Sequence, residues 1–309
     1  MEQRRIGESN LAVSVVGLGG NNFGGRLDLA ATRRVVDKAL ASGITLIDTA
    51  DAYNRGASEE CLGEALAGRR KDVVLATKFG LAMDDTRKGA SRRYIGEAVA
   101  ASLERLRSDW IDLYQLHRPD DLTPIEETLG ALHDLVRAGK VRYIGCSNLS
   151  AVQLAEAQAA GARNNFTAFI CCQDQYSLLS RGIERGLVPA IAARGLSLLP
   201  YFPLASGLLT GKYRRDAMPK DARLAYSTRH ADRFISERNW TIVERLEDFC
   251  AARCRTLLEL AFAWLLAKPF VASVIAGAST PDQVDANVGA VGWVLSADDL
   301  DEVDRITAS

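Results

Sequence analysis

Short apolar runs alternate with longer amphipathic stretches along most of the chain. Stretches such as residues 29–43 and 95–110 repeat their apolar positions every three or four residues, as amphipathic helices do. The runs between such stretches are rich in β-branched residues and have turn-like flanks, which is typical of buried strands. Eight runs of this kind span residues 13–19, 44–48, 73–78, 111–117, 141–147, 166–173, 196–201 and 271–277.

Three short motifs predict where helices begin. The segments TPIE (123–126), SAVQ (150–153) and TPDQ (280–283) each place Ser or Thr three residues before Glu or Gln. This spacing is that of a capping box, in which the two side chains satisfy free backbone N–H groups of the first helical turn. In the first and third motifs the proline would occupy the first helical position.

Eight strands alternating with helices, without a break in composition, predict a parallel (β/α)8 TIM barrel and one domain over residues 1–309. A doubly wound sheet is the alternative, because strand counting from sequence can miss by one or two. Two segments fall outside the repeat: residues 4–14 predict an N-terminal β-hairpin, and residues 202–239 predict a long loop after the seventh strand. Loops of that length are usually functional or mobile.

Composition and charge narrow the class of protein. The chain has 309 residues, 48% hydrophobic and 25% charged, which is ordinary for a globular protein. A net charge of −1 and a pI near 6.4 show no excess of positive charge of the kind that binds nucleic acid or an anionic membrane. No apolar run reaches the ~20 residues that span a bilayer, and residues 1–10 lack the apolar core of a secretory signal. We therefore expect a cytoplasmic protein without nucleic-acid or membrane partners.

Six cysteines in a chain of this length do not suggest a disulfide framework. Cys171 and Cys172 are adjacent in an apolar run, and Cys250 and Cys254 are one helical turn apart. We interpret them as reduced core residues and expect no metal site.

Candidate chemistry gathers where the predicted strands end. In a barrel of this kind the active site lies at the carboxyl ends of the strands. Asp48, Lys78 and His117 end three successive strands, and Tyr53 lies in the loop just after Asp48. Taken singly, these residues could be a turn cap, a surface lysine, a core histidine and a rim aromatic. Their coincidence at strand ends favours one shared proton-transfer site.

The residue types indicate what such a site would do. A tyrosine phenol holds its proton at neutral pH and can donate it. A lysine ammonium beside it stabilises the phenolate and lowers the phenol pKa, so we expect Lys78 to act on Tyr53 in this way. Asp48 would pair with Lys78, and His117 would orient the substrate oxygen. This set suits a carbonyl that gains a proton on oxygen while its carbon receives hydride.

Seven ordered motifs carry a resemblance that covers essentially the whole chain. They are LIDTADAYNRGASEECLGEAL, VVLATKFG, DWIDLYQLHRPD, GKVRYIGCSNLS, QDQYSLLSR, PYFPLASGLLTGKY and VIAGASTPDQVDAN. In these motifs the chain resembles the aldo-keto reductase family, and most closely a bacterial branch related to the β-subunits of voltage-gated potassium channels. The resemblance implies a (β/α)8 barrel, an NADP(H) cofactor and a catalytic tetrad of Asp48, Tyr53, Lys78 and His117, with Tyr53 as general acid.

The same resemblance implies a cofactor site. Ser147, Asn148 and Gln173 match residues that hold the nicotinamide carboxamide, and Tyr201 matches one that stacks on the ring. Asn287 matches a residue that contacts adenine. The remaining cofactor-binding expectations, which include the two cations that would hold a 2′-phosphate, are Pro203, Leu204, Lys212, Arg223, Gly277, Ser279 and Gln283. Gln283 could instead serve its capping box, so NAD(H) stays open as the alternative to NADP(H).

Two other functions compete with this prediction. A Rossmann-type dehydrogenase is disfavoured, because GLGGNNFGG contains no G-x-G-x-x-G and no tyrosine has lysine four residues later. A nucleotide-binding regulatory subunit with vestigial redox activity is the second class, and turnover rate would distinguish it. The expected partner is a small-molecule carbonyl or alcohol, and Arg118 and Arg87 are candidates for contact with an anionic substrate. We expect residues 214–234 to act as a lid over the cofactor. The direction of the reaction and the oligomeric state are not fixed by the sequence.

Overall fold

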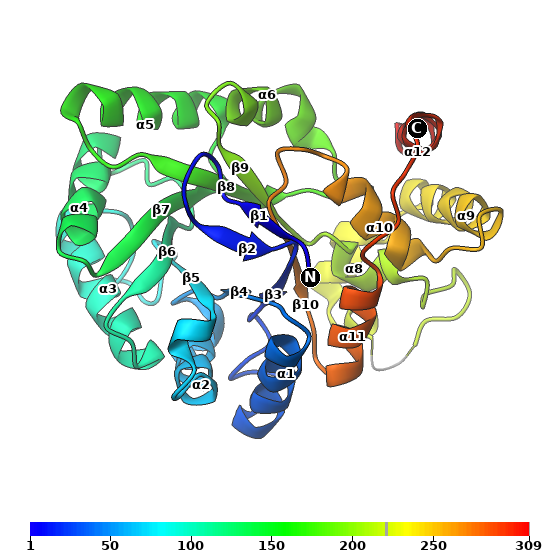
Figure 1. The fold of residues 1–309 in the computed structure, drawn as a ribbon, viewed down its shortest axis with the longest axis horizontal. Coiled ribbons are helices and arrows are strands. Elements are labelled where there is room, and N and C mark those ends of the chain that lie inside the picture. Colours follow the sequence, from blue (N-terminus) through cyan, green and yellow to red (C-terminus); the bar gives the residue numbers. More distant parts are fainter. Residues whose placement is uncertain (220–221, 309) are drawn as a thin grey trace.

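Eight parallel strands form the centre of the molecule in the computed structural model, which describes residues 1–219 and 222–308 (Figure 1). Their order is β10-β3-β4-β5-β6-β7-β8-β9, so each strand pairs with its neighbour in the chain, and Leu198 and Val271 bridge the last gap. The predicted (β/α)8 barrel is therefore confirmed. The strands are β3 (Val16–Gly19), β4 (Leu46–Asp48), β5 (Val74–Phe79), β6 (Ile111–Leu116), β7 (Val141–Ser147), β8 (Phe169–Gln175), β9 (Ser197–Tyr201) and β10 (Val274–Gly277).

Helices surround this barrel on the outside (Figure 1). Their apolar faces pack on the outer faces of the strands, and residues from both form the larger hydrophobic core. None of the described helices is long and apolar enough to cross a membrane. Apart from the two helices within residues 223–234, the described α-helices are α1 (Leu29–Ala41), α2 (Ala57–Ala65), α3 (Arg92–Leu106), α4 (Ile125–Arg137), α5 (Ala151–Asn164), α6 (Leu187–Ala192), α9 (Glu237–Ala251), α10 (Leu257–Leu266), α11 (Pro281–Gly289) and α12 (Ala297–Thr307).

The three predicted capping boxes have three different outcomes. At α5, Ser150 and Gln153 form the complete reciprocal box. At α11, Pro281 is the first helical residue and Thr280 caps the helix, but Gln283 accepts its hydrogen bond from the N–H of Ser279 at 2.7 Å. At α4 the prediction is wrong: the helix begins at Ile125, and the Thr123 hydroxyl donates to Asp120 instead.

The predicted strand over residues 13–19 is two strands. Residues Ala12–Ser14 form β2, which pairs antiparallel with β1 (Gln3–Arg5), and β3 begins at Val16. The chain changes sheets at Val15, whose N–H bonds to Glu2 while the N–H of Ser14 bonds to the Thr45 side chain. The apolar pattern hides the break because Val15 and its neighbours on both sides are buried. The predicted N-terminal hairpin is confirmed.

This hairpin closes the end of the barrel opposite the strand carboxyl ends. Ile6, Leu11 and Val13 are buried against barrel residues that include Leu46 and Leu113. The turn passes close to the barrel backbone at Gly7, where a Cβ would lie 2.6 Å from the carbonyl oxygen of residue 170 and φ is +57°. The interior is therefore sealed by apolar contacts at this end, and a cleft can form only at the other.

The segment over residues 202–239 is more structured than a long loop. It contains a 3-10 stretch (Ala205–Thr210), α7 (Arg223–Tyr226), α8 (Thr228–Phe234) and the start of α9. Buried Tyr213 anchors it by accepting a hydrogen bond from the N–H of Leu224 at 3.2 Å. Residues 220 and 221 of the expected lid, 214–234, lie outside the described residues.

The hairpin seal gives a test of stability. Ile6 is fully buried, so Ile6→Ala should lower the free energy of unfolding by about 2–5 kcal/mol. Leu122→Ala is the control, because that side chain is 92% exposed and its loss should change stability by less than about 0.5 kcal/mol. Urea denaturation followed by circular dichroism measures both. Equal effects of the two substitutions would contradict the seal.

Candidate active site

A cleft of about 640 Å³ opens at the carboxyl ends of the strands. It brings together almost all the residues singled out from the sequence. Lys78 lies beneath its floor, fully buried, and the others line it: Asp48, Tyr53, His117, Ser147, Asn148, Gln173, Tyr201, Pro203, Leu204, Lys212, Arg223, Gly277, Ser279, Gln283 and Asn287.

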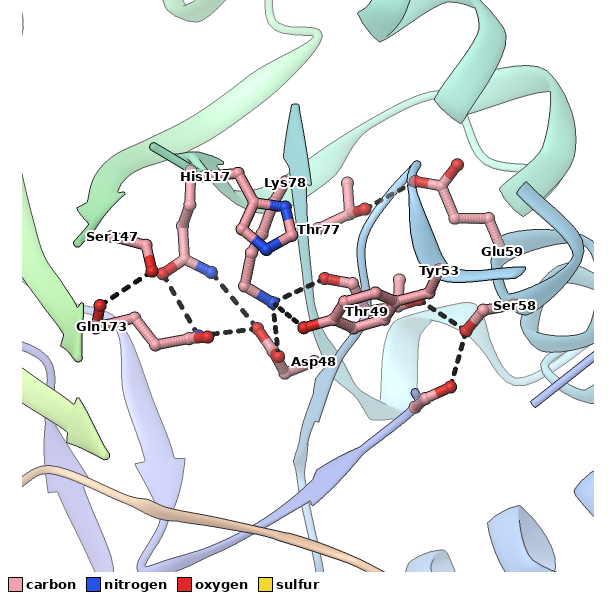
Figure 2. Close-up of polar contacts among 12 residues, drawn as sticks. Asp48, Thr49, Tyr53, Ser58, Glu59, Thr77, Lys78, His117, Ser147 and Gln173 are labelled. Carbon is pink, nitrogen blue, oxygen red and sulfur yellow. Dashed lines mark hydrogen bonds and ion pairs between the residues drawn. The ribbon is translucent and has the colours of Figure 1, made fainter. Parts of the chain in front are cut away.

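Lys78 and Asp48 form a buried ion pair at the base of this cleft (Figure 2). They occupy the ends of the adjacent strands β4 and β5, and Lys78 Nζ lies 2.6 Å from Asp48 Oδ2. The ammonium also donates to the carbonyl oxygen of Thr49 at 2.8 Å. Burial lowers the pKa of Lys78, but Asp48 and Tyr53 outweigh it and the net direction is upward. The lysine is therefore held charged.

The other oxygen of Asp48 is held by two glutamines. Gln173 Nε2 donates to Asp48 Oδ1 at 2.9 Å, and Gln115 Nε2 does so at 3.2 Å. Gln115 was not among the residues predicted from the sequence. Its only signal was its place as a polar residue inside the predicted strand IDLYQLH, two positions before His117. The three hydrogen bonds with Thr49, Gln115 and Gln173 compensate part of the cost of burying two charges.

Tyr53 is aimed at this pair by an unusual turn. It opens a short 3-10 segment (Tyr53–Gly56) in which Asn54 and Arg55 have φ of +51° and +56°. The Asn54 amide secures the turn by donating to the carbonyl oxygen of Phe23 at 2.7 Å. As a result, the Tyr53 hydroxyl oxygen lies 3.4 Å from Lys78 Nζ, on the side of the cleft (Figure 2).

The acidity of Tyr53 differs from the expectation. Lys78 does lower the pKa of the phenol, as predicted, but burial raises it by more, so the net direction is upward. The phenol thus stays in its proton-donating form throughout the physiological range. The sequence identified Lys78 as the cation beside Tyr53, but the burial of the phenol, which has the larger effect on its pKa, could not be predicted from it.

His117 completes the group as a neutral ring. Its backbone N–H bonds to the carbonyl of Phe79 at 2.9 Å, and its ring meets Tyr53 edge-on with centroids 5.8 Å apart. Burial lowers its pKa to about 2, and the charges of Lys78 and Arg118 act in the same direction. Its Nδ1 is buried without a hydrogen-bond partner among the described residues. A neutral imidazole can orient an oxygen without supplying a second charge.

A hydrogen-bonded chain links the neighbouring strand ends. Asn148 adopts φ of +61°, and its amide donates to the carbonyl oxygen of His117 at 3.0 Å and to the Ser147 hydroxyl at 2.9 Å. Its own oxygen accepts from the Tyr201 hydroxyl at 2.8 Å. Ser147 in turn donates to the carbonyl oxygen of Gln173 at 2.8 Å. These bonds fix the wall of the cleft beside His117.

The far side of the cleft carries cations. Arg223 donates to Asn22 Oδ1 at 2.7 Å, and the Asn22 amide donates to the Ser279 hydroxyl at 3.2 Å. Burial lowers the pKa of Lys212, and Arg223 and Arg26 lower it further. Arg223 and Lys212 therefore lie close together although the chain between them includes two residues outside the described ranges. Mutually repelling cations in a cleft are typical of a binding site for an anion.

A second group of buried acids lies behind the tyrosine. Glu59 accepts from the Thr77 hydroxyl at 2.5 Å and pairs with Arg105 at 2.7 Å. Asp51 is 1% exposed, and neither of its carboxylate oxygens has a partner among the described residues. Burial, reinforced by Glu59, raises the pKa of Asp51 to about 7. These residues were not predicted from the sequence, because Asp51 directly after DTA resembles an ordinary loop acid and Glu59 an ordinary acid in the first turn of a helix.

Comparisons with known proteins agree with this geometry. The model of the aldo/keto reductase family matches residues 15–308, and the chain belongs to that family. Membership supports an oxidoreductase. The chain is 34% identical to aldo-keto reductase YhdN of Bacillus subtilis, over 99% of this chain and 93% of that protein.

Two further relatives show the range of the similarity. A probable voltage-gated potassium channel subunit beta of Arabidopsis thaliana is 35% identical over all of this chain and 97% of its own length. Versiconal hemiacetal acetate reductase of Aspergillus parasiticus is 33% identical over 97% of this chain and 95% of its own length. Relatives with reductase names and a relative with a channel-subunit name therefore match over nearly the same residues.

The buried neutral histidine predicts a pH effect on stability. The folded-state pKa of about 2 is below the unfolded value of about 6.5, so His117 costs stability as pH falls below 6.5. Relative to His117→Gln, the wild-type protein should lose about 2 kcal/mol between pH 6.5 and 5 and nothing between pH 8 and 7. Urea unfolding of both proteins at each pH measures this. A stability difference that stays constant from pH 8 to 5 would show that His117 has the same pKa in the folded and unfolded protein, and would contradict a ring held neutral by burial.

Proposed function

We propose that the protein is an NADP(H)-dependent oxidoreductase that reduces aldehydes or ketones to alcohols, or runs the reverse reaction, with Tyr53 as general acid. The observation that carries this proposal is the position of the Tyr53 hydroxyl, 3.4 Å from the buried and charged Lys78, at the wall of a cleft. A protonated phenol beside an ammonium suits an oxygen that must gain a proton.

Each residue of the site has a part in the proposed reaction. Tyr53 gives its proton to the carbonyl oxygen, and Lys78 stabilises the phenolate that remains. Asp48 keeps Lys78 charged and in place, through the ion pair at 2.6 Å. Neutral His117 donates a hydrogen bond to the carbonyl oxygen from Nε2. When bound, the reduced nicotinamide supplies the hydride.

The charges of the cleft fit a dinucleotide phosphate. Lys212 and Arg223 would hold the 2′-phosphate, with the backbone before α11 and the side chains of Ser279 and Gln283 beside them. We propose that Gln283 contributes less than its position suggests, because its oxygen already accepts from Ser279 N–H. The rest of the cofactor would contact Ser147, Asn148, Gln173, Tyr201, Pro203, Leu204, Gly277 and Asn287, all of which line the cleft.

A nucleotide-binding regulatory subunit is the second candidate function. The similarity to the Arabidopsis protein named as a potassium channel subunit favours it. Both proposals predict cofactor binding, so turnover decides between them. All six cysteines are free thiols, which suits the cytoplasmic location that we propose for either function.

Removal of the Tyr53 hydroxyl tests the general acid. Tyr53→Phe should lower kcat for carbonyl reduction by about 10²–10⁴-fold, because proton donation is lost, while the Kd of NADPH changes little. Tyr143→Phe is the matched control, since this half-buried tyrosine packs against the barrel interior away from the cleft. Consumption of NADPH at its absorbance band gives kcat, and fluorescence titration gives Kd. Tight NADPH binding with almost no turnover by the wild-type protein would instead support the regulatory subunit.

Cofactor choice has its own test. Lys212→Met should weaken NADPH binding about tenfold or more and leave NADH binding within about threefold, because only NADPH carries the 2′-phosphate. Lys140→Met, at an exposed position outside the cleft, should change neither Kd. Equal losses for both cofactors would place Lys212 at the pyrophosphate rather than at the 2′-phosphate.

A further inference from the structure

The basic side chains that line the cleft outnumber the acidic ones. Asp48 is the only acid that lines it within the described ranges, and that carboxylate is committed to Lys78. None of five basic residues in the lining forms an ion pair with a described carboxylate: Arg118, Lys212, Arg223, Arg229 and Arg233. Elsewhere most described arginines pair with acids, as Arg105 does with Glu59 and Arg181 with Asp304. Unpaired cations in a cleft favour anionic ligands.

Four of these five cations divide between the two ends of the cleft. Lys212 and Arg223 lie at the end formed by Asn22 and Ser279. Arg223 donates a hydrogen bond to Asn22, which donates to Ser279, and burial and the charge of Arg223 both lower the pKa of Lys212. Arg118 follows His117 directly in the chain and is close enough to lower its pKa, after the larger effects of burial and Lys78. Arg118 therefore belongs to the end that contains the tyrosine.

Arg233 joins Arg118 at this end. Burial and Asp174 raise the pKa of Tyr201, while the charges of Arg233 and Arg118 both oppose them. The guanidinium of Arg233 also lies 5.3 Å from the ring centroid of Phe202, the residue after Tyr201, and contacts Gln175. The charges of the two arginines thus act on the same tyrosine from different elements, Arg118 from the loop after β6 and Arg233 from α8, and both side chains line the cleft.

The proposed cofactor does not account for this second pair of charges. A reduced nicotinamide ring is neutral, and the site proposed for the 2′-phosphate is formed by Lys212 and Arg223. The acids near Arg118 and Arg233 do not neutralise them either. Asp120 is occupied by the N–H groups of Ala90 and Leu122 and by a hydroxyl, and Asp174 does not line the cleft.

We propose that the substrate carries an anionic group, a carboxylate or a phosphate, a few bonds from its carbonyl, and that Arg118 and Arg233 bind this group beside the tetrad. This inference rests on the proposed reductase function and adds the substrate class. A guanidinium binds either anion through two parallel hydrogen bonds, and such charge-assisted bonds also fix orientation. Arg118 then holds the substrate with its carbonyl directed toward Tyr53 and His117, which makes it a specificity-determining residue.

Matched substrates test the proposal. The aldehydes 4-formylbenzoate and its methyl ester differ mainly in charge, as do glyceraldehyde 3-phosphate and glyceraldehyde. The ratio of kcat/KM for the anionic over the neutral member should exceed about tenfold in the wild-type protein for at least one pair. The pair with the larger ratio shows whether carboxylate or phosphate is preferred. A ratio near one for both pairs would overturn the proposal.

Substitutions of Arg118 and Arg233 test whether these residues bind the anionic group of the substrate. Arg118→Gln should reduce that ratio about tenfold, mainly through KM of the anionic member, and Arg118→Lys should retain part of it. Arg233→Gln should reduce it as well. Arg34→Gln, at an exposed position on α1, is the control and should leave the ratio unchanged. A ratio that survives both Arg118→Gln and Arg233→Gln would place the anion elsewhere.

A binding measurement separates this proposal from the reductase itself. Calorimetry of 4-formylbenzoate and its methyl ester against the protein saturated with NADP+ needs no turnover. Preferential binding of the acid, lost in Arg118→Gln, would support the anion site even if no carbonyl were reduced. Equal binding of acid and ester, together with turnover of neutral aldehydes that depends on Tyr53, would overturn the anion site and retain the reductase.

Discussion

The buried ion pair between Lys78 and Asp48 is the interaction on which the site depends. Two charges out of water are costly unless their remaining hydrogen bonds are satisfied, and here Thr49, Gln115 and Gln173 satisfy them. The pair in turn fixes a positive charge 3.4 Å from the Tyr53 hydroxyl. Without that charge, no cation would stabilise the phenolate that Tyr53 becomes when it gives up its proton, and the proposed proton transfer would be unfavourable.

The two ends of the barrel differ, and this difference places the ion pair and the tyrosine in one cleft. The hairpin seals one end with apolar side chains, so the polar ends of the strands collect at the other. Neighbouring parallel strands bring Asp48 and Lys78 side by side, and the following loops bring the tyrosine and the cations. Burial keeps Tyr53 protonated and His117 neutral at the base of the cleft, where we propose that proton transfer takes place. The cations that we propose for anion binding line the same cleft.

Much of this could be predicted from the sequence because strand ends converge in any parallel barrel. Strand periodicity was enough to bring Asp48, Lys78 and His117 together, and the loop just after Asp48 added Tyr53. Contacts that depend on three-dimensional placement were not predictable: Gln115 looked like one polar residue in a strand, and Asp51 like a loop acid. The split at Val15 was hidden because burial continues across it, and the direction of the Tyr53 pKa depended on how far the fold excludes water.

Transfer of label from the cofactor tests the central claim most directly. The protein, in excess over an aromatic aldehyde, would be mixed with NADPH that carries deuterium at both C4 positions of the nicotinamide, and the alcohol analysed by mass spectrometry and NMR. The account predicts one deuterium on the carbinol carbon and, in heavy water with unlabelled cofactor, none on that carbon. Bound cofactor with no labelled alcohol after prolonged incubation with aromatic aldehydes, dicarbonyls and sugar aldehydes would contradict it.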